Sequence, residues 1–429
     1  MLNKLIVFLS LASLSLWAVS LPNIQHWKTK NGSRVYFVEA PELPMVDIKV
    51  VFDAGASRDE KLQGVALLTN ALITEGTKNM NANQIAEYFD NLGAQIGNSS
   101  LRDMSGMEFR SLSDGETLNK VVDMAAEIIR EPVFPKQAFD REKNRLLVMI
   151  KSKKQSPGDI ASDAFYESIY GSHPYHSAPE GNEQSIAAIQ RDNLVAHHKN
   201  YYVAKNATVA VVGALNRKAA EQLIERLIGK LPKGNEAKPI PPVAVLQKPV
   251  RLEIQHPSSQ THILLGQPGI RRDDSDYFAL YVGNHILGGS GLVSRISDEI
   301  REKRGLAYSS YSYFLPMQQN GPFQIGLQTR NDQFRQALEV LQDTVKKFIE
   351  QGPTKDKLIQ AKQNITGGFA LRLDSNKEIA NYLSVIGFYN LPLDYLNTFN
   401  KKVEAVTVEQ IKTAFQKRSE DTRLNSSHQ

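Results

Sequence analysis

The fold of this 429-residue chain can be inferred from two stretches, Val46–Glu60, VDIKVVFDAGASRDE, and Thr261–Ser275, THILLGQPGIRRDDS. Each begins with an aliphatic, β-branched run that is typical of a strand, and continues with a glycine turn and an Arg-Asp pair. Four residues of the first stretch and its continuation recur 214 positions later: Gly55 as Gly269, Arg58 as Arg272, Asp59 as Asp273 and Asn70 as Asn284. Repetition at this distance indicates duplicated domains rather than a solenoid, whose period is roughly 20–50 residues.

Strand-like and helix-like segments alternate within both halves. Residues 46–52 and 207–212 are rich in β-branched side chains and are predicted to be strands. Apolar residues at spacings of three and four predict helices at 118–129, 334–349, 355–371 and 408–415. The sequence therefore predicts an α+β fold, with helices packed on a sheet in each half.

The first twenty residues have the features of an export signal. Lys4 supplies a positive charge, Leu5–Trp17 form an apolar core, and Ala18-Val19-Ser20 match a signal-peptidase site. We therefore expect residues 1–20 to be a signal peptide and the protein to be exported, into the periplasm of a bacterium. A buried N-terminal strand or an uncleaved anchor is the alternative.

A segment rich in Pro, Gly and Lys, residues 232–251, separates the two halves and is predicted to be an extended, solvated linker. The expected domains are thus residues 21–231 and residues 252–417. Residues 418–429 lack apolar periodicity and are predicted to form a disordered tail.

Composition excludes several classes of function. The chain has 51 Lys and Arg against 46 Asp and Glu, a net charge of +5, with both signs mixed along its length. Nucleic-acid binding, which needs basic residues gathered on one face, is therefore not expected. Because cysteine is absent, disulfides, thiolate zinc sites and a cysteine nucleophile are ruled out. No segment after the signal approaches the ~20 apolar residues of a transmembrane helix.

Two histidine pairs, His173/His176 and His197/His198, are the first candidates for metal ligands. A zinc site needs a third and usually a fourth ligand at fixed geometry, and no carboxylate motif accompanies either pair. A structural or solvent-exposed role is the simpler interpretation. Residues 286–291, ILGGSG, lack the Lys-Ser/Thr of a phosphate loop and indicate a hairpin or the turn before a helix.

The segment Gly64–Thr77, GVALLTNALITEGT, predicts an apolar helix that ends at Gly76. With the preceding residues 55–60, it resembles the active-site helix of the pitrilysin and mitochondrial-processing-peptidase family of zinc metalloproteases, G-x-A-H-F-L-E-H-x-x-x-x-G-T. In that family the two His bind zinc and the Glu is the general base. The resemblance covers essentially the whole mature chain. It implies two homologous domains, each with a mostly antiparallel sheet and helices packed on one face.

The family's zinc ligands are replaced in this chain. The two His positions fall on Leu67 and Ala71, and the position of the Glu base falls on Asn70. The third ligand, a Glu in the family, corresponds to Val148, in the run that begins at Phe139. Aliphatic side chains cannot donate an electron pair to zinc, and an amide cannot take a proton from water near neutral pH. We therefore expect no zinc and no other cofactor in this chain.

A second family signature lies at residues 294–311, SRISDEIREKRGLAYSSY. It is similar to S-R-L-x-x-x-L-R-E-K-x-G-L-A-Y, whose Arg and Tyr hydrogen-bond the substrate's carbonyl near the scissile bond. Arg301 and Tyr308 match these two residues, and both side chains can donate hydrogen bonds to an oxyanion. From spacing alone, Arg301 could instead pair with Glu299 or Asp298, and Tyr308 could be a core residue of a strand.

The resemblance implies the non-metal subunit of a heterodimeric peptidase. The expected partner is a zinc-bearing subunit of similar fold, on whose zinc site Arg301 and Tyr308 act in trans. The implied substrates are unfolded peptides, bound as an added strand on a sheet edge inside a chamber. An isolated chain is expected to be inactive and could form a homodimer. The alternative is a non-enzymatic peptide-binding or scaffold protein of the same fold, like the core subunits of respiratory complex III.

Overall fold

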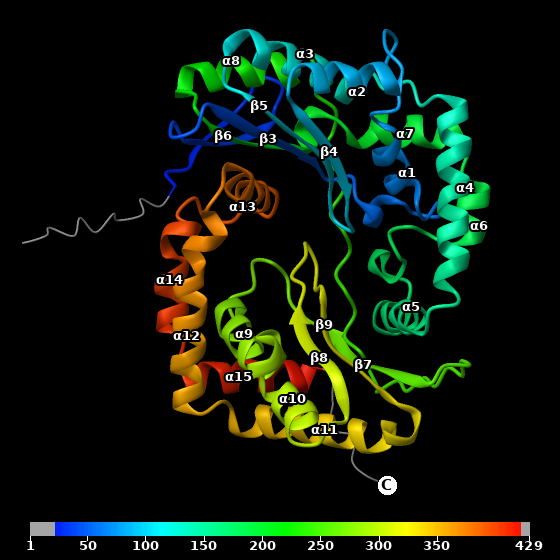
Figure 1. Ribbon diagram of the computed structural model, residues 1–429, viewed down its shortest axis with the longest axis vertical. Helices are drawn as coiled ribbons and strands as arrows, with labels where there is room; N and C mark the ends of the chain where they lie inside the picture. The colour runs from blue at the N-terminus through cyan, green and yellow to red at the C-terminus, as the bar shows by residue number, and fades with distance from the viewer. Residues whose placement is uncertain (1–21, 422–429) are drawn as a thin grey trace, which may run out of the picture.

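The computed structural model describes residues 22–421. Within that range the chain forms two α+β halves, one above the other in Figure 1, which confirms the predicted fold class. The predicted signal peptide, residues 1–20, lies outside the described residues, as do residues 422–429.

The first half is built on a sheet that has six strands among the described residues, in the order β1-β2-β6-β3-β5-β4. All neighbouring strands are antiparallel except β2 and β6, which are parallel. The strands are β1 Gln25–Lys28, β2 Arg34–Glu39, β3 Met45–Phe52, β4 Gln95–Ser100, β5 Ser105–Leu112 and β6 Ala207–Gly213. β3 and β6 extend the two predicted strands by one residue at an end, and both lie inside the sheet.

Helices of the same half cover the outer face of this sheet. The amphipathic helix predicted at 118–129 is α3, which begins where the Asp114 carboxylate accepts a hydrogen bond from the Thr117 amide. Its apolar face and that of α8 share one core with the sheet. The helices are α1 Val65–Leu72, α2 Ala82–Asn91, α3 Gly115–Arg130, α4 Lys136–Lys153, α5 Pro157–Tyr170, α6 Glu183–Ala188, α7 Arg191–Tyr201 and α8 Arg217–Ile228.

The second half has a smaller sheet, of three strands among the described residues, in the order β7-β9-β8. All of its pairings are antiparallel. Its strands are β7 Gln260–Pro268, β8 Ala307–Phe314 and β9 Pro322–Arg330. Its helices are α9 Tyr277–Asn284, α10 Arg295–Ser297, α11 Phe334–Gln351, α12 Lys355–Phe369, α13 Asn376–Phe388, α14 Tyr395–Ala405 and α15 Val408–Asp421.

One helix of each half packs against the sheet of the other half. α13 lies across the inner face of the first sheet, against β2, β3 and β6, while α5 packs against β7 of the second sheet (Figure 1). Small residues permit both contacts. A Cβ on Gly387 of α13 would overlap the ring of Tyr36, and one on Gly266 of β7 would lie 2.8 Å from the ring of Phe165. Helices therefore cover the outer face, as predicted, and one exchanged helix also covers part of each inner face.

The repeated glycines mark the same construction in both halves. A Cβ on Gly55 would overlap the carbonyl oxygens of Leu101 and Arg102, at the tip of the β4–β5 hairpin. A Cβ on Gly269 would lie 2.9 Å from the amide nitrogen of Phe323, at the start of β9. Only glycine allows a hairpin to cross so closely over the end of the strand that precedes it, which is β3 in the first half and β7 in the second. The structure thus supports the duplication on physical grounds.

Two predicted boundary segments differ from expectation. Residues 418–421, assigned to a disordered tail, continue helix α15, because Arg418 forms an ion pair with Asp274 at 2.8 Å. The linker 232–251 contains no helix or strand, but it is not wholly solvated. Ile240 is buried, and the carbonyl of Lys238 accepts a hydrogen bond from Arg58.

A buried carboxylate joins the two halves. Asp103, at the tip of the β4–β5 hairpin, accepts hydrogen bonds from the hydroxyl of Tyr175 at 2.6 Å and the hydroxyl of Tyr389 at 3.0 Å. It also accepts one from the backbone amide of Gln318, in the β8–β9 hairpin, at 2.7 Å. Burial raises the pKa of Asp103 above its ordinary value. This junction fixes the two hairpins tip to tip.

We predict that Asp103→Ala lowers the free energy of unfolding by about 3 kcal/mol, because buried Tyr175 and two half-buried donors lose a shared acceptor. Chemical denaturation followed by circular dichroism measures the change. Asp90→Ala, which removes a carboxylate from the exposed side of α2, is the control and should change the stability by less than about 0.5 kcal/mol. Equal stability of the two variants would contradict a central role for the junction.

Candidate functional site

Helix α1, which corresponds to the family's zinc helix, begins at a capped glycine turn. Gly64 has φ +96°, a conformation that favours glycine, and its Cβ would also clash with Ile186. The Asp59 carboxylate accepts hydrogen bonds from the amides of Gly64 at 2.7 Å and Ala66 at 2.8 Å. Burial raises the pKa of Asp59 to about 7, although both amides favour its charged form. Asp59, the second residue of the repeated Arg-Asp pair, therefore positions the start of α1.

The four zinc-site positions lie on α1 and α4 but carry no metal ligands. Leu67 and Ala71 are half-buried, and Leu67 packs against the apolar cluster between α1 and α4. Val148 on α4 is 68% exposed. Among the described residues, no group of three His, Asp or Glu side chains could hold a metal ion. The aliphatic side chains at the three ligand positions, Leu67, Ala71 and Val148, do not fit zinc, since none offers it an electron pair.

Asn70, at the position of the general base, has a structural role. Its Nδ2 donates hydrogen bonds to the carbonyl of Gly106 at 3.1 Å and to the hydroxyl of Tyr202 at 3.2 Å. The repeat partner Asn284 donates in the same way from α9 to the carbonyl of Ser312 at 3.0 Å. In both halves this asparagine ties a helix to the sheet backbone. The sequence repeat contained this signal, because Asn70 and Asn284 were among its four identities.

The four histidines of the two candidate pairs form hydrogen bonds with backbone carbonyl groups. Hydrogen bonds to carbonyl oxygens join His173 to Pro241, His176 to His173, His197 to Ala54 and His198 to Ile129, at 2.8, 2.8, 3.2 and 2.8 Å. Burial lowers the pKa of His197 to about 4. Tyr175, between the first two histidines, is fully buried at the hairpin junction. These contacts support the structural interpretation of both pairs.

Arg301 and Tyr308 lie together, at the end of one element and the start of the next. Arg301 belongs to the π-helical turn η6, Asp298–Glu302, and Tyr308 is the second residue of β8. The guanidinium carbon lies 4.8 Å from the centre of the Tyr308 ring, as in a cation–π contact. Tyr308 is 84% exposed and is therefore not a core residue.

The alternative ion pairs of Arg301 are made by other residues. Glu299 pairs with Lys303 at 2.6 Å and with Arg304 at 2.7 Å. Asp298 also pairs with Lys303, whereas Arg301 has a 3.5 Å contact with its neighbour Glu302. The guanidinium and the exposed phenol thus remain accessible as hydrogen-bond donors. They can stabilise negative charge on an oxygen, but they cannot activate water by themselves.

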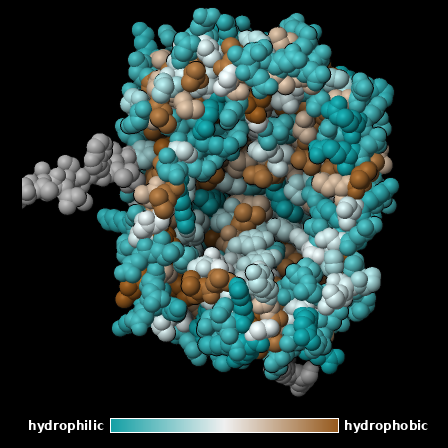
Figure 2. Space-filling model, viewed as in Figure 1, coloured by the Kyte–Doolittle hydropathy of each residue, from teal (hydrophilic) through white to brown (hydrophobic). Residues whose placement is uncertain are grey.

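The space-filling view shows a recess between the two halves (Figure 2).

Among the described residues, no helix is both long and apolar enough to cross a membrane.

The duplicated fold and the altered zinc helix define the class, a chain built on the plan of pitrilysin-type zinc metallopeptidases. Comparison with known families agrees. Residues 34–181 match the family described as insulinase (peptidase family M16), and residues 188–365 match the peptidase M16 inactive domain. The chain belongs to peptidase family M16, as the resemblance in its sequence implied.

Similar proteins extend over most of the chain. A crystal structure of a peptidase M16 inactive domain from Pseudomonas fluorescens is 42% identical, covers 92% of this chain and 94% of its own, and has a TM-score of 0.89. The uncharacterized zinc protease YmxG of Bacillus subtilis is 26% identical over 82% of this chain and 85% of its own length. A protease from Helicobacter pylori, 21% identical over 92% of this chain and 96% of its own, shares the fold with a TM-score of 0.82.

The zinc-site replacements predict that purified protein retains no stoichiometric zinc after dialysis, as measured by elemental analysis. The comparison variant is Leu67→His/Ala71→His/Val148→Glu, which restores three ligands and leaves the hydrogen bonds of Asn70 intact. It should retain more zinc than the wild type, because Val148 is exposed and the other two positions are half-buried. One tightly held zinc per wild-type chain would contradict the prediction.

Buried His197 predicts a loss of stability in acid. Its pKa is about 4 in the folded chain and 6.5 when exposed, so the unfolded chain binds more protons between these values. The contribution of neutral His197 to the free energy of unfolding is fully present above pH 6.5. It falls by about 1.4 kcal/mol per pH unit towards pH 4, about 3 kcal/mol in total.

His197→Gln removes this titration and keeps a hydrogen-bond donor. Because Asp59, with its raised pKa, acts in the opposite direction, the measured quantity is the difference between wild type and variant. Denaturation at a series of pH values should show that difference changing from pH 6.5 to pH 4. Parallel curves would contradict the prediction.

Proposed function

We propose that this chain is the non-catalytic subunit of a heterodimeric zinc peptidase, exported into a bacterial periplasm. Its partner is an M16 subunit that carries the zinc and the general base. This chain supplies Arg301 and Tyr308 to the joint active site.

One observation carries the proposal. All four zinc-site positions have changed, yet Arg301 and Tyr308 remain, in contact with each other and accessible. Tyr308, at 84% exposure, contributes little to the stability of its own half, and Arg301 has one acidic contact, with Glu302. A pair of donors with so small a structural role is well suited to act on a group outside the chain.

The two donors fit the chemistry of peptide hydrolysis. As water attacks a peptide carbonyl, negative charge collects on the carbonyl oxygen, and preorganised donors stabilise that charge more than they stabilise the substrate. The Arg301–Tyr308 contact holds both groups in one place. Their proposed role is to hydrogen-bond the carbonyl of an unfolded peptide bound at the partner's zinc.

Arg301→Ala and Tyr308→Phe should each lower kcat of the reconstituted heterodimer by about 10²–10³, the usual effect of losing one oxyanion donor. The assay follows the cleavage of an unfolded peptide by this chain mixed with a zinc-bearing M16 subunit identified by pull-down and mass spectrometry. Arg335→Ala, at the exposed start of α11, is the control and should leave kcat unchanged. Wild-type turnover in both variants, with assembly intact, would favour the non-enzymatic scaffold.

A further inference from the structure

Arg272, in the segment between β7 and α9, is a charged side chain without an acidic partner. Among the described residues, its guanidinium forms no hydrogen bond and no ion pair. The neighbouring carboxylates have other partners, since Asp273 pairs with Arg271 at 2.9 Å and Asp274 pairs with Arg418 at 2.8 Å. Arg272 is half-buried. A charge that is partly removed from water is costly unless an opposite charge lies beside it, so this arginine can gain by binding an anion.

The repeat partner Arg58 shows which anion suits this position. Nε and Nη2 of Arg58 donate hydrogen bonds to the two carboxylate oxygens of Asp53, both at 2.7 Å. A planar guanidinium matches a planar carboxylate in this paired arrangement. In the second half the residues before Gly269 are Gln267 and Pro268, so no carboxylate corresponds to Asp53. The second half thus has the arginine without the carboxylate.

The guanidinium of Arg272 lies against a pair of stacked tyrosines. Its carbon is 5.1 Å from the centre of the Tyr277 ring, which stacks on the Tyr281 ring at 5.9 Å between centres. A second arginine, Arg372, donates from Nη1 to the hydroxyl of Tyr281 at 2.8 Å. Arg372 likewise forms no ion pair in the part of the chain that the structure describes. Two unpaired positive charges therefore flank one pair of rings, and their combined field attracts an anion.

The surroundings of Arg272 keep its guanidinium charged and in place. Burial lowers the pKa of Arg272, but the tyrosines around it, first of all Tyr277 and Tyr395, raise the pKa further, to above its ordinary value. The backbone amide of Arg272 donates to the carbonyl of Met317 at 2.9 Å. Met317 belongs to the β8–β9 hairpin, which also contacts Asp103. The arginine is therefore held beside the junction of the two halves.

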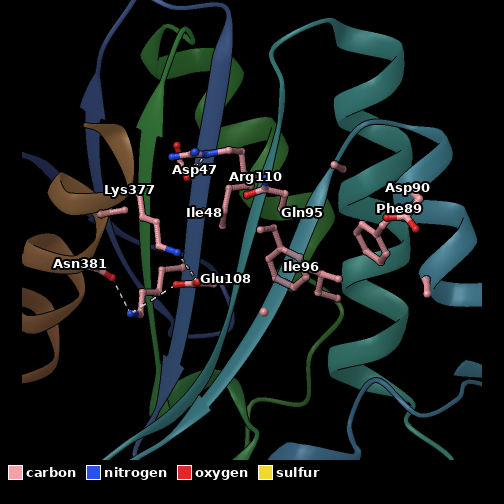
Figure 3. A pocket seen from close by; sticks show the side chains of 16 residues that line it. Asp47, Ile48, Phe89, Asp90, Gln95, Ile96, Glu108, Arg110, Lys377 and Asn381 are labelled. Atoms are coloured by element: carbon pink, nitrogen blue, oxygen red, sulfur yellow. Dashed lines mark hydrogen bonds and ion pairs between the residues drawn. The ribbon is translucent and has the colours of Figure 1, made fainter. Parts of the chain in front are cut away.

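Arginine and lysine side chains in the pocket beside α13 do have acidic partners (Figure 3). This pocket, of about 450 Å³, lies between α13 and the strands β3, β4 and β5. Within it Arg110 pairs with Asp47 at 2.9 Å, and Lys377 pairs with Glu108 at 2.9 Å. Such internal pairs need no anion from outside. Arg272 differs from them because it has no carboxylate to bind.

We propose that Arg272 binds the carboxylate group of an external ligand. Nε is buried, whereas Nη1 and Nη2 are not, so the carboxylate binds end-on to the two terminal nitrogens. The ring of Tyr277 can contact an aromatic or apolar group attached to the carboxylate. Binding of a small carboxylate needs this chain alone. Use of the site for the C-terminal carboxylate of a peptide rests on the proposed function, because it presumes a substrate in the recess.

The test measures binding of N-acetyl-L-phenylalanine to the isolated chain by ligand-detected NMR, with the corresponding amide as the uncharged comparison. A second pair of probes is an unstructured pentapeptide with a free or an amidated C-terminus. Arg272→Gln removes the charge, and Arg272→Lys keeps the charge but loses the planar fork. Arg271→Gln is the matched control, since it removes an adjacent, exposed guanidinium that already pairs with Asp273. Thermal unfolding establishes which variants are folded.

We expect wild type and Arg271→Gln to bind the free carboxylates alike, Arg272→Gln to bind them about tenfold or more weakly, and Arg272→Lys to bind them several-fold more weakly. Both amides should bind the wild type weakly. Binding of the acetylated amino acid supports a site for small carboxylates, and binding of the peptide alone supports a site for peptide C-termini. If Arg272→Gln does not fold, the comparison of Arg272→Lys with Arg271→Gln decides the matter.

Three results would overturn the proposal. They are no binding of either free carboxylate to the wild type, equal binding by the folded Arg272 variants and Arg271→Gln, and equal binding of the carboxylates and their amides. None of these results would bear on Arg301 and Tyr308, because no partner subunit is present.

Discussion

The arrangement of both halves depends on the buried carboxylate of Asp103. It accepts hydrogen bonds from the β8–β9 hairpin, from Tyr389 beyond α13, and from Tyr175. Each donor comes from a different part of the chain, and none lies in the hairpin that carries Asp103. A buried carboxylate is costly unless such donors surround it, so the donors and the carboxylate require one another. The hairpin tips consequently meet in one register, which fixes the outline of the recess between the sheets.

The duplication explains why this junction is possible. Gly55 and Gly269 let a hairpin cross the end of the preceding strand, β3 or β7, in each half, and the two hairpins point towards each other. The exchanged helices α5 and α13 then bury the surfaces that each half would otherwise expose. The repeated arginines have different partners in the two halves. Arg58 forms an ion pair with Asp53, whereas its repeat partner Arg272 lies over the ring of Tyr277.

The sequence predicted what depends on local pattern. Apolar periodicity predicted α3, α11 and α12, and four identities at one spacing indicated the duplication. Long-range choices were not predictable. The exchange of α5 and α13 depends on packing at Gly266 and Gly387, which resemble any other glycines in a strand or helix. Likewise, Arg418 lies in a segment without apolar periodicity, and its ion pairs with the distant Asp274 and Asp276 stabilise the end of α15.

For the site, the family motif supplied the positions, and the structure explains how they could change without loss of the fold. Leu67 adds to the apolar cluster between α1 and α4, and Asn70 adopts the helix-to-sheet bonding that Asn284 already makes in the other half. The replacement of a metal centre thus used interactions that were present in the duplicated scaffold. By contrast, nothing in the packing of its own half requires Tyr308, which is exposed. An exposed phenol beside a guanidinium, in a chain whose zinc-site positions carry aliphatic or structural side chains, is what the proposed contribution to another subunit's chemistry requires.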